Sequence, residues 1–147
     1  MLTSQTFLSS QEREQITAAI RDAEGKSPGE IRVFFEKHAK VSPLDRAVEV
    51  FRRLKMDKTN LRTGILIYVA YQDKTFAILG DEGIHQKVPE NFWDETKRIM
   101  EQHFMEGRFV EGLKAGIQLA GEQLSKHFKA SSENPNELSD DIIIEDE

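Results

Sequence analysis

The sequence predicts an α/β fold, a three-layer α/β/α sandwich with a small mixed β-sheet flanked by about four helices. Amphipathic helical segments alternate along the chain with short runs rich in branched and aromatic residues. The run 64–70 is almost continuously apolar, which is typical of a strand covered on both faces. The turn 71–74 is so short that the next apolar run, 75–79, must return as an antiparallel partner.

The first helix is predicted over residues 10–24. Ser9 and Glu12 have the spacing of a capping box, apolar residues then recur at helical intervals, and Gly25 ends the run. Residues 29–37 follow a Ser-Pro turn and contain the branched and aromatic side chains that favour a strand.

A second helix is predicted to begin at Ser42, because Pro43 suits the first helical position, where its missing amide costs nothing. This helix connects strand 29–37 to strand 64–70. A strand-helix-strand unit is a right-handed crossover, so the two strands should run parallel. Together with the antiparallel strand 75–79 they make a mixed sheet.

Two further helices are predicted near the C-terminus. The first begins at Pro89 and ends at Gly107, and the second begins at about Phe109. Gly112 and Gly116 lie one turn apart within the second, where each glycine costs about 1 kcal/mol. Their presence predicts a close backbone approach to the sheet or to a neighbouring helix.

The composition limits the chemistry that the chain can use. It contains 147 residues, enough for one domain, and no cysteine, so disulfides, thiolate zinc sites and cysteine nucleophiles are excluded. Any metal must therefore be held by oxygen or imidazole ligands, which favours a hard cation. The four histidines have no close-pair spacing, which gives a zinc site little support.

The acidity of the chain is concentrated in its last residues. Residues 131–147 hold seven acids and no base; subtracting these from the 26 acids leaves 19, against 20 bases. The sequence therefore predicts a nearly neutral domain over residues 1–129 and an acidic, flexible tail over 130–147. Within the tail, Ile142, Ile143 and Ile144 could dock on the domain or on a neighbour, although a solvated tail is favoured.

The same patterns argue against some classes of partner and indicate a location. No basic run is present that would suit a nucleic-acid backbone, and no apolar stretch is long enough to cross a bilayer. Residues 1–8 lack the pattern of a signal peptide, so a cytoplasmic protein is expected. An unknown protein partner could bind the tail or an exposed Phe92 and Trp93, although core packing of these two aromatic residues is favoured.

Four segments carry a resemblance to a known family: 29–33 (GEIRV), 63–67 (TGILI), 76–84 (FAILGDEGI) and 104–113 (FMEGRFVEGL). In this order they resemble the TPM domain, over roughly residues 9–128. The most specific pieces are the turn 80–83 and the phenylalanine-to-glycine element before the last helix. The turn departs from the common pattern, so that His85 stands where many members have an acid.

The resemblance implies an α/β/α sandwich, calcium binding as in some members, and an acid-phosphatase-like activity as in a plant relative. Most relatives are secreted or membrane-anchored, and residues 1–8 show neither feature.

A candidate cation site lies at one end of the predicted sheet. The topology brings the end of strand 75–79 to the start of the two parallel strands, near Glu30, Asp57, Asn60, Asp81 and Glu82. Clustered carboxylates repel one another, and a hard cation relieves that repulsion. The sequence therefore predicts a calcium site, with magnesium as the alternative, whose ligands are Asp81 and Glu82 and then Asn60 and Glu30. The alternative is that Asp81 and Glu82 are solvent-exposed turn residues with no ligand.

The leading hypothesis is a non-enzymatic, cation-binding interaction domain. The competing hypothesis is a weak metal-assisted phosphatase, in which His85 could act as a general acid, although a surface histidine is favoured. No catalytic residue is otherwise indicated.

Overall fold

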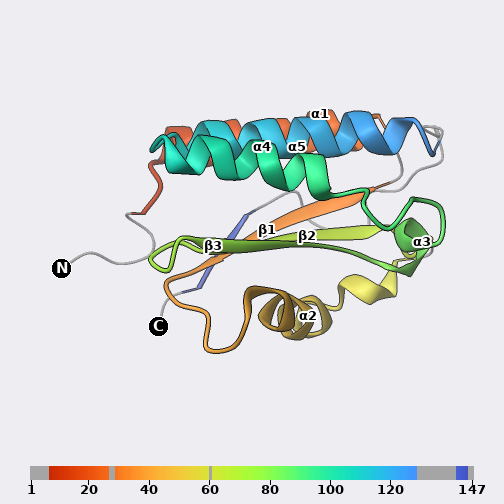
Figure 1. The fold of residues 1–147 in the computed structure, drawn as a ribbon, viewed down its shortest axis with the longest axis horizontal. Helices are drawn as coiled ribbons and strands as arrows, with labels where there is room; N and C mark the ends of the chain where they lie inside the picture. The colour runs from red at the N-terminus through yellow and green to blue at the C-terminus, as the bar shows by residue number, and fades with distance from the viewer. Residues whose placement is uncertain (1–6, 27–28, 60, 129–141, 146–147) are drawn as a thin grey trace.

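The computed structural model describes residues 7–26, 29–59, 61–128 and 142–145, and they form the predicted three-layer sandwich (Figure 1). Helices α1, α4 and α5 cover one face of a four-stranded sheet, and α2 covers the other. The elements are α1 (Ser10–Glu24), β1 (Glu30–Glu36), α2 (Pro43–Arg53), the 3-10 helix η2 (Met56–Lys58), β2 (Gly64–Ala70), β3 (Thr75–Gly80), α3 (Glu82–His85), α4 (Asp94–Met105), α5 (Phe109–Ser125) and β4 (Ile143–Ile144).

The sheet is mixed, with the strand order β3-β2-β1-β4. β1 and β2 are parallel over their whole length, from the pair Glu30 and Gly64 to the pair Glu36 and Ala70. β3 returns antiparallel to β2, with Ile65 opposite Gly80. Every residue of β2 is buried, which confirms that the continuous apolar run is the strand covered on both faces.

Local signals begin the first two helices as predicted. The hydroxyl of Ser9 accepts a hydrogen bond from the amide of Glu12, whose carboxylate accepts one from the amide of Ser9, so the capping box is complete. The hydroxyl of Ser42 accepts from the amide of Asp45, and Pro43 occupies the first helical position. Both caps satisfy amides that would otherwise lack a partner.

Two apolar cores lie on opposite faces of the sheet. Ile31, Val33 and Phe35 of β1 point into the larger core beneath α1, α4 and α5, whereas Phe34 packs into the smaller core over α2. This alternation follows from the period of two along a strand. Among the described residues, Phe92 is buried in the larger core and Trp93 packs against it, which confirms the prediction of core packing for this pair.

The glycines of α5 allow a close approach to α4. A Cβ atom at Gly112 would lie 2.7 Å from the ring of Phe104, and one at Gly116 would lie 2.4 Å from the sulfur of Met100. The predicted close approach is therefore to a neighbouring helix. A side chain at either position would push the two helices apart.

One helix start differs from the sequence prediction, and one short helix is additional to it. The helix expected from Pro89 begins at Asp94, because residues 90–93 form turns that place Phe92 and Trp93 against the larger core. The short helix α3 was not predicted. It follows β3 directly, and its four residues are too few to show a periodic pattern.

The end of the chain contributes a strand that the sequence analysis did not predict. Ile143 and Ile144 pair in parallel with Phe34 and Phe35, and the amide of Glu145 donates to the carbonyl of Phe35 at 2.8 Å. Ile142 is 4% exposed. Residues 142–145 therefore adopt the docked alternative rather than the favoured solvated one, whereas the rest of the proposed flexible tail lies outside the described residues.

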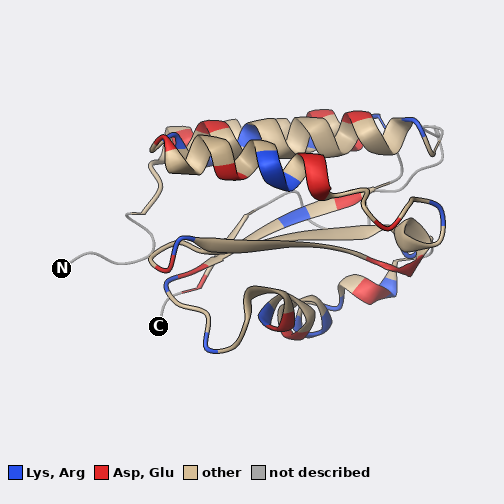
Figure 2. Ribbon diagram, viewed as in Figure 1, with Lys and Arg blue, Asp and Glu red and all other residues tan. Residues whose placement is uncertain are grey.

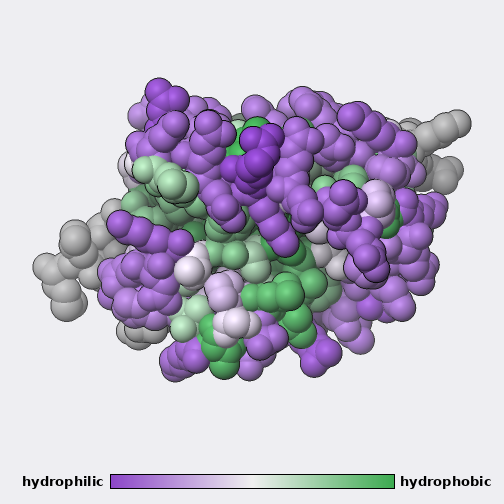
Figure 3. Space-filling view, in the orientation of Figure 1, coloured by the Kyte–Doolittle hydropathy of each residue, from purple (hydrophilic) through white to green (hydrophobic). Residues whose placement is uncertain are grey.

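Charged residues of both signs and some hydrophobic residues lie on the surface of the domain. Acidic and basic residues are interspersed along the helices (Figure 2). Hydrophobic surface gathers in the middle of one face, below the layer of α1, α4 and α5 and over the edge of the sheet (Figure 3). Among the described helices, none has the length and apolar character needed to cross a membrane.

Truncation after residue 141 should destabilise the domain, because it removes the buried side chain of Ile142 and the pairing of β4 with β1. We expect a loss of about 2–4 kcal/mol in the free energy of unfolding, measured by urea denaturation. Truncation after Glu145 is the matched control and should leave stability unchanged. Equal stability of the full chain and the chain ending at residue 141 would contradict the docking of β4.

Candidate acidic corner

The predicted site lies where the parallel strands begin, and we call its described residues Glu30, Asp81 and Glu82 the acidic corner. The amide of Asp81 donates to the carbonyl of Gly64 at 2.9 Å, and Gly64 is the register partner of Glu30 on its other side. Glu30 and Asp81 thus lie on opposite sides of Gly64. Because neighbouring strands are spaced by about 4.7–4.9 Å, the backbones of Glu30 and Asp81 are about 10 Å apart. The starts of β1 and β2 and the end of β3 therefore lie at the same end of the sheet, as the topology predicts.

Asp81 is held by an arginine that the sequence analysis did not connect with it. Nε of Arg62 donates to Oδ2 of Asp81 at 2.8 Å, and Nη2 donates to Oδ1 at 2.9 Å. Oδ1 also accepts from the amide of Glu82 at 2.7 Å, so Asp81 caps α3. These hydrogen bonds and the charge of Asp81 raise the pKa of Arg62. The guanidinium of Arg62 therefore supplies, next to Asp81, the positive charge that the sequence analysis expected from a metal ion.

The loop that carries Arg62 is locked against α3. Arg62 has a φ of 55°, in the left-handed region, and its carbonyl accepts from the amide of Gly83 at 2.8 Å. A Cβ atom at Gly83 would lie 2.1 Å from the carbonyl oxygen of Leu61 and 2.6 Å from that of Arg62. Only glycine permits this approach, which explains the second glycine of the turn 80–83 in physical terms.

The remaining candidate ligands have different environments. Glu82 is exposed, and its carboxylate lies 3.5 Å from Nη1 of Arg62. Glu30 is buried at the start of β1, 3% exposed. Asn60 lies outside the described residues. Asp57, within η2, has its carboxylate 3.9 Å from the amine of Lys58.

The donors suit a hard cation chemically, but they do not form a preassembled site. Both oxygens of Asp81 bind Arg62, and no three acidic or histidine side chains are grouped closely enough to hold a metal within the ranges that the structure describes. His85 is exposed at the end of α3, and its amide donates to the carbonyl of Asp81. A cation held by both oxygens of Asp81 would have to displace Arg62.

The comparisons with known proteins establish the family. The model of the TPM domain matches residues 2–123. The chain belongs to the TPM domain family. The resemblance inferred from the four sequence segments is thereby confirmed. No curated protein matches the chain.

Solved structures agree with this assignment. The chain is similar to the NMR structure of BA42 protein from the psychrophilic bacterium Bizionia argentinensis, with 45% identity and a TM-score of 0.90, covering 95% of this chain and 96% of that one. The N-terminal domain of cg2496 protein from Corynebacterium glutamicum has a TM-score of 0.64 at 16% identity, covering 85% and 76%. The N-terminal domain of a P. gingivalis protein has a TM-score of 0.70 at 16% identity, covering 84% and 81%. The last two show a shared fold.

A second polar cluster of this TPM domain, at the opposite end of β1, escaped the sequence analysis. The carboxylate of Glu36 is buried and accepts hydrogen bonds from Arg46, at 2.9 and 3.1 Å, and from the hydroxyl of Tyr68. Glu145, beyond β4, lies 2.6 Å from Arg53 and 3.4 Å from Arg46. The cluster therefore ties β1, β2, α2 and the end of the chain together.

The opposite charges of Glu36 and Arg46 stabilise each other. Burial acts to raise the pKa of Glu36, but the hydrogen bonds from Arg46 and Tyr68 and the charges of Arg46 and Arg53 outweigh it, so this pKa is lowered. Burial and the hydrogen bond to Glu36 raise the pKa of the Tyr68 hydroxyl. Arg46 and Arg53 are 99 and 92 residues from Glu145 in the sequence, so no local sequence pattern could predict that they pair with it. Burial, hydrogen bonds and the ion pair of Glu36 with Arg46 account for these shifts.

The stability contributed by Glu36 should disappear in acid. Because its folded-state pKa lies below the ordinary value of 4.5, the contribution is complete above the unfolded-state pKa and is lost as the pH falls through the folded-state pKa. Glu36→Gln should cost about 2 kcal/mol at pH 7, and the difference from the unmodified protein should close below about pH 4.5. Urea denaturation across this range measures it.

Glu49→Gln is the matched control, because Glu49 is exposed and also pairs with Arg46, at 3.3 Å. Its effect should be no more than about 0.5 kcal/mol. A cost of Glu36→Gln that stays constant down to pH 3 would show that the carboxylate charge of Glu36 does not stabilise the fold.

Proposed function

We propose that this TPM domain is a non-enzymatic interaction domain that binds a divalent cation, calcium first and magnesium as the alternative, at the acidic corner. The observation that supports the proposal is the pairing of Asp81 with Arg62. The guanidinium of Arg62 is held by both carboxylate oxygens of Asp81, and these two oxygens would equally suit a hard cation.

The charge balance favours exchange of Arg62 for a doubly charged ion. Asp81 and Glu82 carry two negative charges near a single guanidinium, so the tip of the corner stays negative while Arg62 is bound. The side chain of Arg62 is 44% exposed and can extend into solvent at modest cost. Asp81 and Glu82 would then hold the cation, with Glu30 as a further oxygen donor at the start of β1.

The competition predicts weak binding. The cation binds only the fraction of molecules in which Arg62 has left Asp81, so the apparent dissociation constant is the intrinsic one divided by that fraction. Arg62 thereby sets the concentration range in which the corner responds. Phosphate-monoester hydrolysis, the enzymatic alternative, depends on the same cation, so a corner that binds none would remove the metal-assisted reaction as well.

Removal of Arg62 should strengthen cation binding. We expect calcium to cause saturable amide shifts centred on residues 80–83 and the dissociation constant to fall about tenfold in Arg62→Gly, which suits the left-handed backbone and adds no ligand. Asp81→Asn should abolish the shifts. Amide NMR titrations with calcium and then magnesium measure all three proteins.

Asp73→Asn provides the control for loss of one acidic charge, because Asp73 lies in the hairpin at the opposite end of the sheet, where it pairs with His38. Its calcium affinity should equal that of the unmodified protein. Absence of localised shifts in Arg62→Gly at millimolar calcium would refute the proposed cation site.

A further inference from the structure

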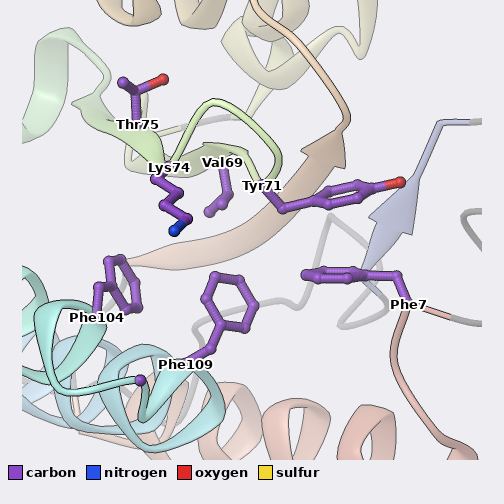
Figure 4. A pocket seen from close by; sticks show the side chains of 8 residues that line it. Phe7, Val69, Tyr71, Lys74, Thr75, Phe104 and Phe109 are labelled. Atoms are coloured by element: carbon purple, nitrogen blue, oxygen red, sulfur yellow. The ribbon is translucent and has the colours of Figure 1, made fainter.

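An aromatic pocket lies at the carboxyl ends of β1 and β2, the end of the sheet opposite the acidic corner. We use the name for a cavity of about 290 Å³ lined by Phe7, Val69, Tyr71, Lys74, Thr75, Phe104, Gly107 and Phe109 (Figure 4). Three separate parts of the chain meet here, which are the segment before α1, the hairpin between β2 and β3, and the junction of α4 and α5. Ligands of open α/β sheets commonly bind at the carboxyl ends of strands.

The walls of the pocket are a continuous series of aromatic rings. Phe7 stacks on Tyr71 with the ring centres 3.9 Å apart and meets Phe109 edge-on at 5.2 Å. Phe109 in turn stacks on Phe104 at 5.1 Å. All four rings are only half-buried, so apolar surface remains open to an incoming molecule. Concave apolar sites of this kind are where small molecules usually bind.

One cation projects into this apolar cavity. Figure 4 shows the side chain of Lys74 extending from the hairpin between Val69 and Phe104, with its amine directed into the space between the rings. No described carboxylate pairs with Lys74, although surface lysines elsewhere in the described chain, such as Lys26, do pair with acids. The pocket thus combines an apolar wall with a single positive group.

The hairpin that carries Lys74 is held in place. The carboxylate of the preceding Asp73 accepts from the amide of Ala39 at 2.8 Å and binds Nδ1 of His38 at 2.7 Å. Both hydrogen bonds lower the pKa of the Asp73 carboxyl, and the one with His38 has the larger effect. Lys74 itself has a φ of 58°, in the left-handed region that a lysine rarely adopts. The fixed hairpin therefore directs this lysine toward the pocket at a small conformational cost.

We propose that the aromatic pocket binds a small monocarboxylate with an apolar body, its hydrocarbon or ring against the aromatic wall and its carboxylate on the amine of Lys74. The cavity, at about 290 Å³, lies just below the usual range for ligand sites, about 300–1,000 Å³, so a medium-chain or single-ring acid fits and a larger lipid does not. A charge-assisted hydrogen bond at the rim then fixes the orientation of the ligand.

This inference is independent of the cation site. The pocket shares no residue with the acidic corner and lies at the other end of β2 and β3. Loss of calcium binding in Asp81→Asn therefore tests the corner alone, and the experiment below tests the pocket alone.

The test compares octanoate with octanol, which has the same chain length and no charge. Octanoate should cause saturable NMR shifts at the methyl groups of Val69 and the amide of Gly107, and octanol should bind about tenfold more weakly. Lys74→Met keeps the apolar stem and removes the charge, so it should weaken octanoate binding about tenfold and leave octanol binding unchanged.

Lys55→Met is the matched control, because Lys55 is also exposed and has a φ of 57°, but lies at the start of η2 on the other side of the sheet. It should bind octanoate as the unmodified protein does. Equal affinities for octanoate and octanol, unchanged octanoate binding in Lys74→Met, or shifts that do not saturate would each overturn the proposal.

Discussion

The parallel pairing of β1 with β2 is the constraint on which the rest of the structure depends. The seven residue pairs from Glu30 and Gly64 to Glu36 and Ala70 set which side chains meet at each end of the sheet and which face each residue covers. A shift of one residue would exchange the two faces, placing Phe34 beneath the three-helix layer and Ile31 over α2. Because β2 is buried along its whole length, such a shift would disrupt both cores at once.

The two ends of this sheet have different physical characters. Where the parallel strands begin, acidic side chains gather, and Arg62 neutralises part of their charge through a bidentate pair with Asp81. Where they end, aromatic rings remain half-exposed around a lysine that has no acidic partner among the described residues. The first arrangement favours exchange of one cation for another, and the second favours an apolar molecule with a negative group.

The sequence predicted the elements whose signals are local. Ser9 with Glu12, and Ser42 with Pro43, identified two helix starts, and the apolar run 64–70 identified the central strand. The placement of the end of β3 beside the starts of β1 and β2 followed from topology alone. The pair of Arg62 with Asp81 did not, because it depends on the left-handed backbone of Arg62 and the approach of Gly83, neither of which has a periodic signature.

Contacts between distant parts of the chain were equally inaccessible. β4 is only two residues long, and the ion pairs of Glu145 beside it join residues 99 and 92 positions apart, Arg46 and Arg53. The most direct test of the exchange at the acidic corner is the NMR signal of the Nε proton of Arg62 during a calcium titration. If calcium replaces Arg62 on Asp81, this proton is protected from exchange in the free protein and loses its protection as calcium binds. Calcium binding that leaves the signal unchanged would contradict the exchange.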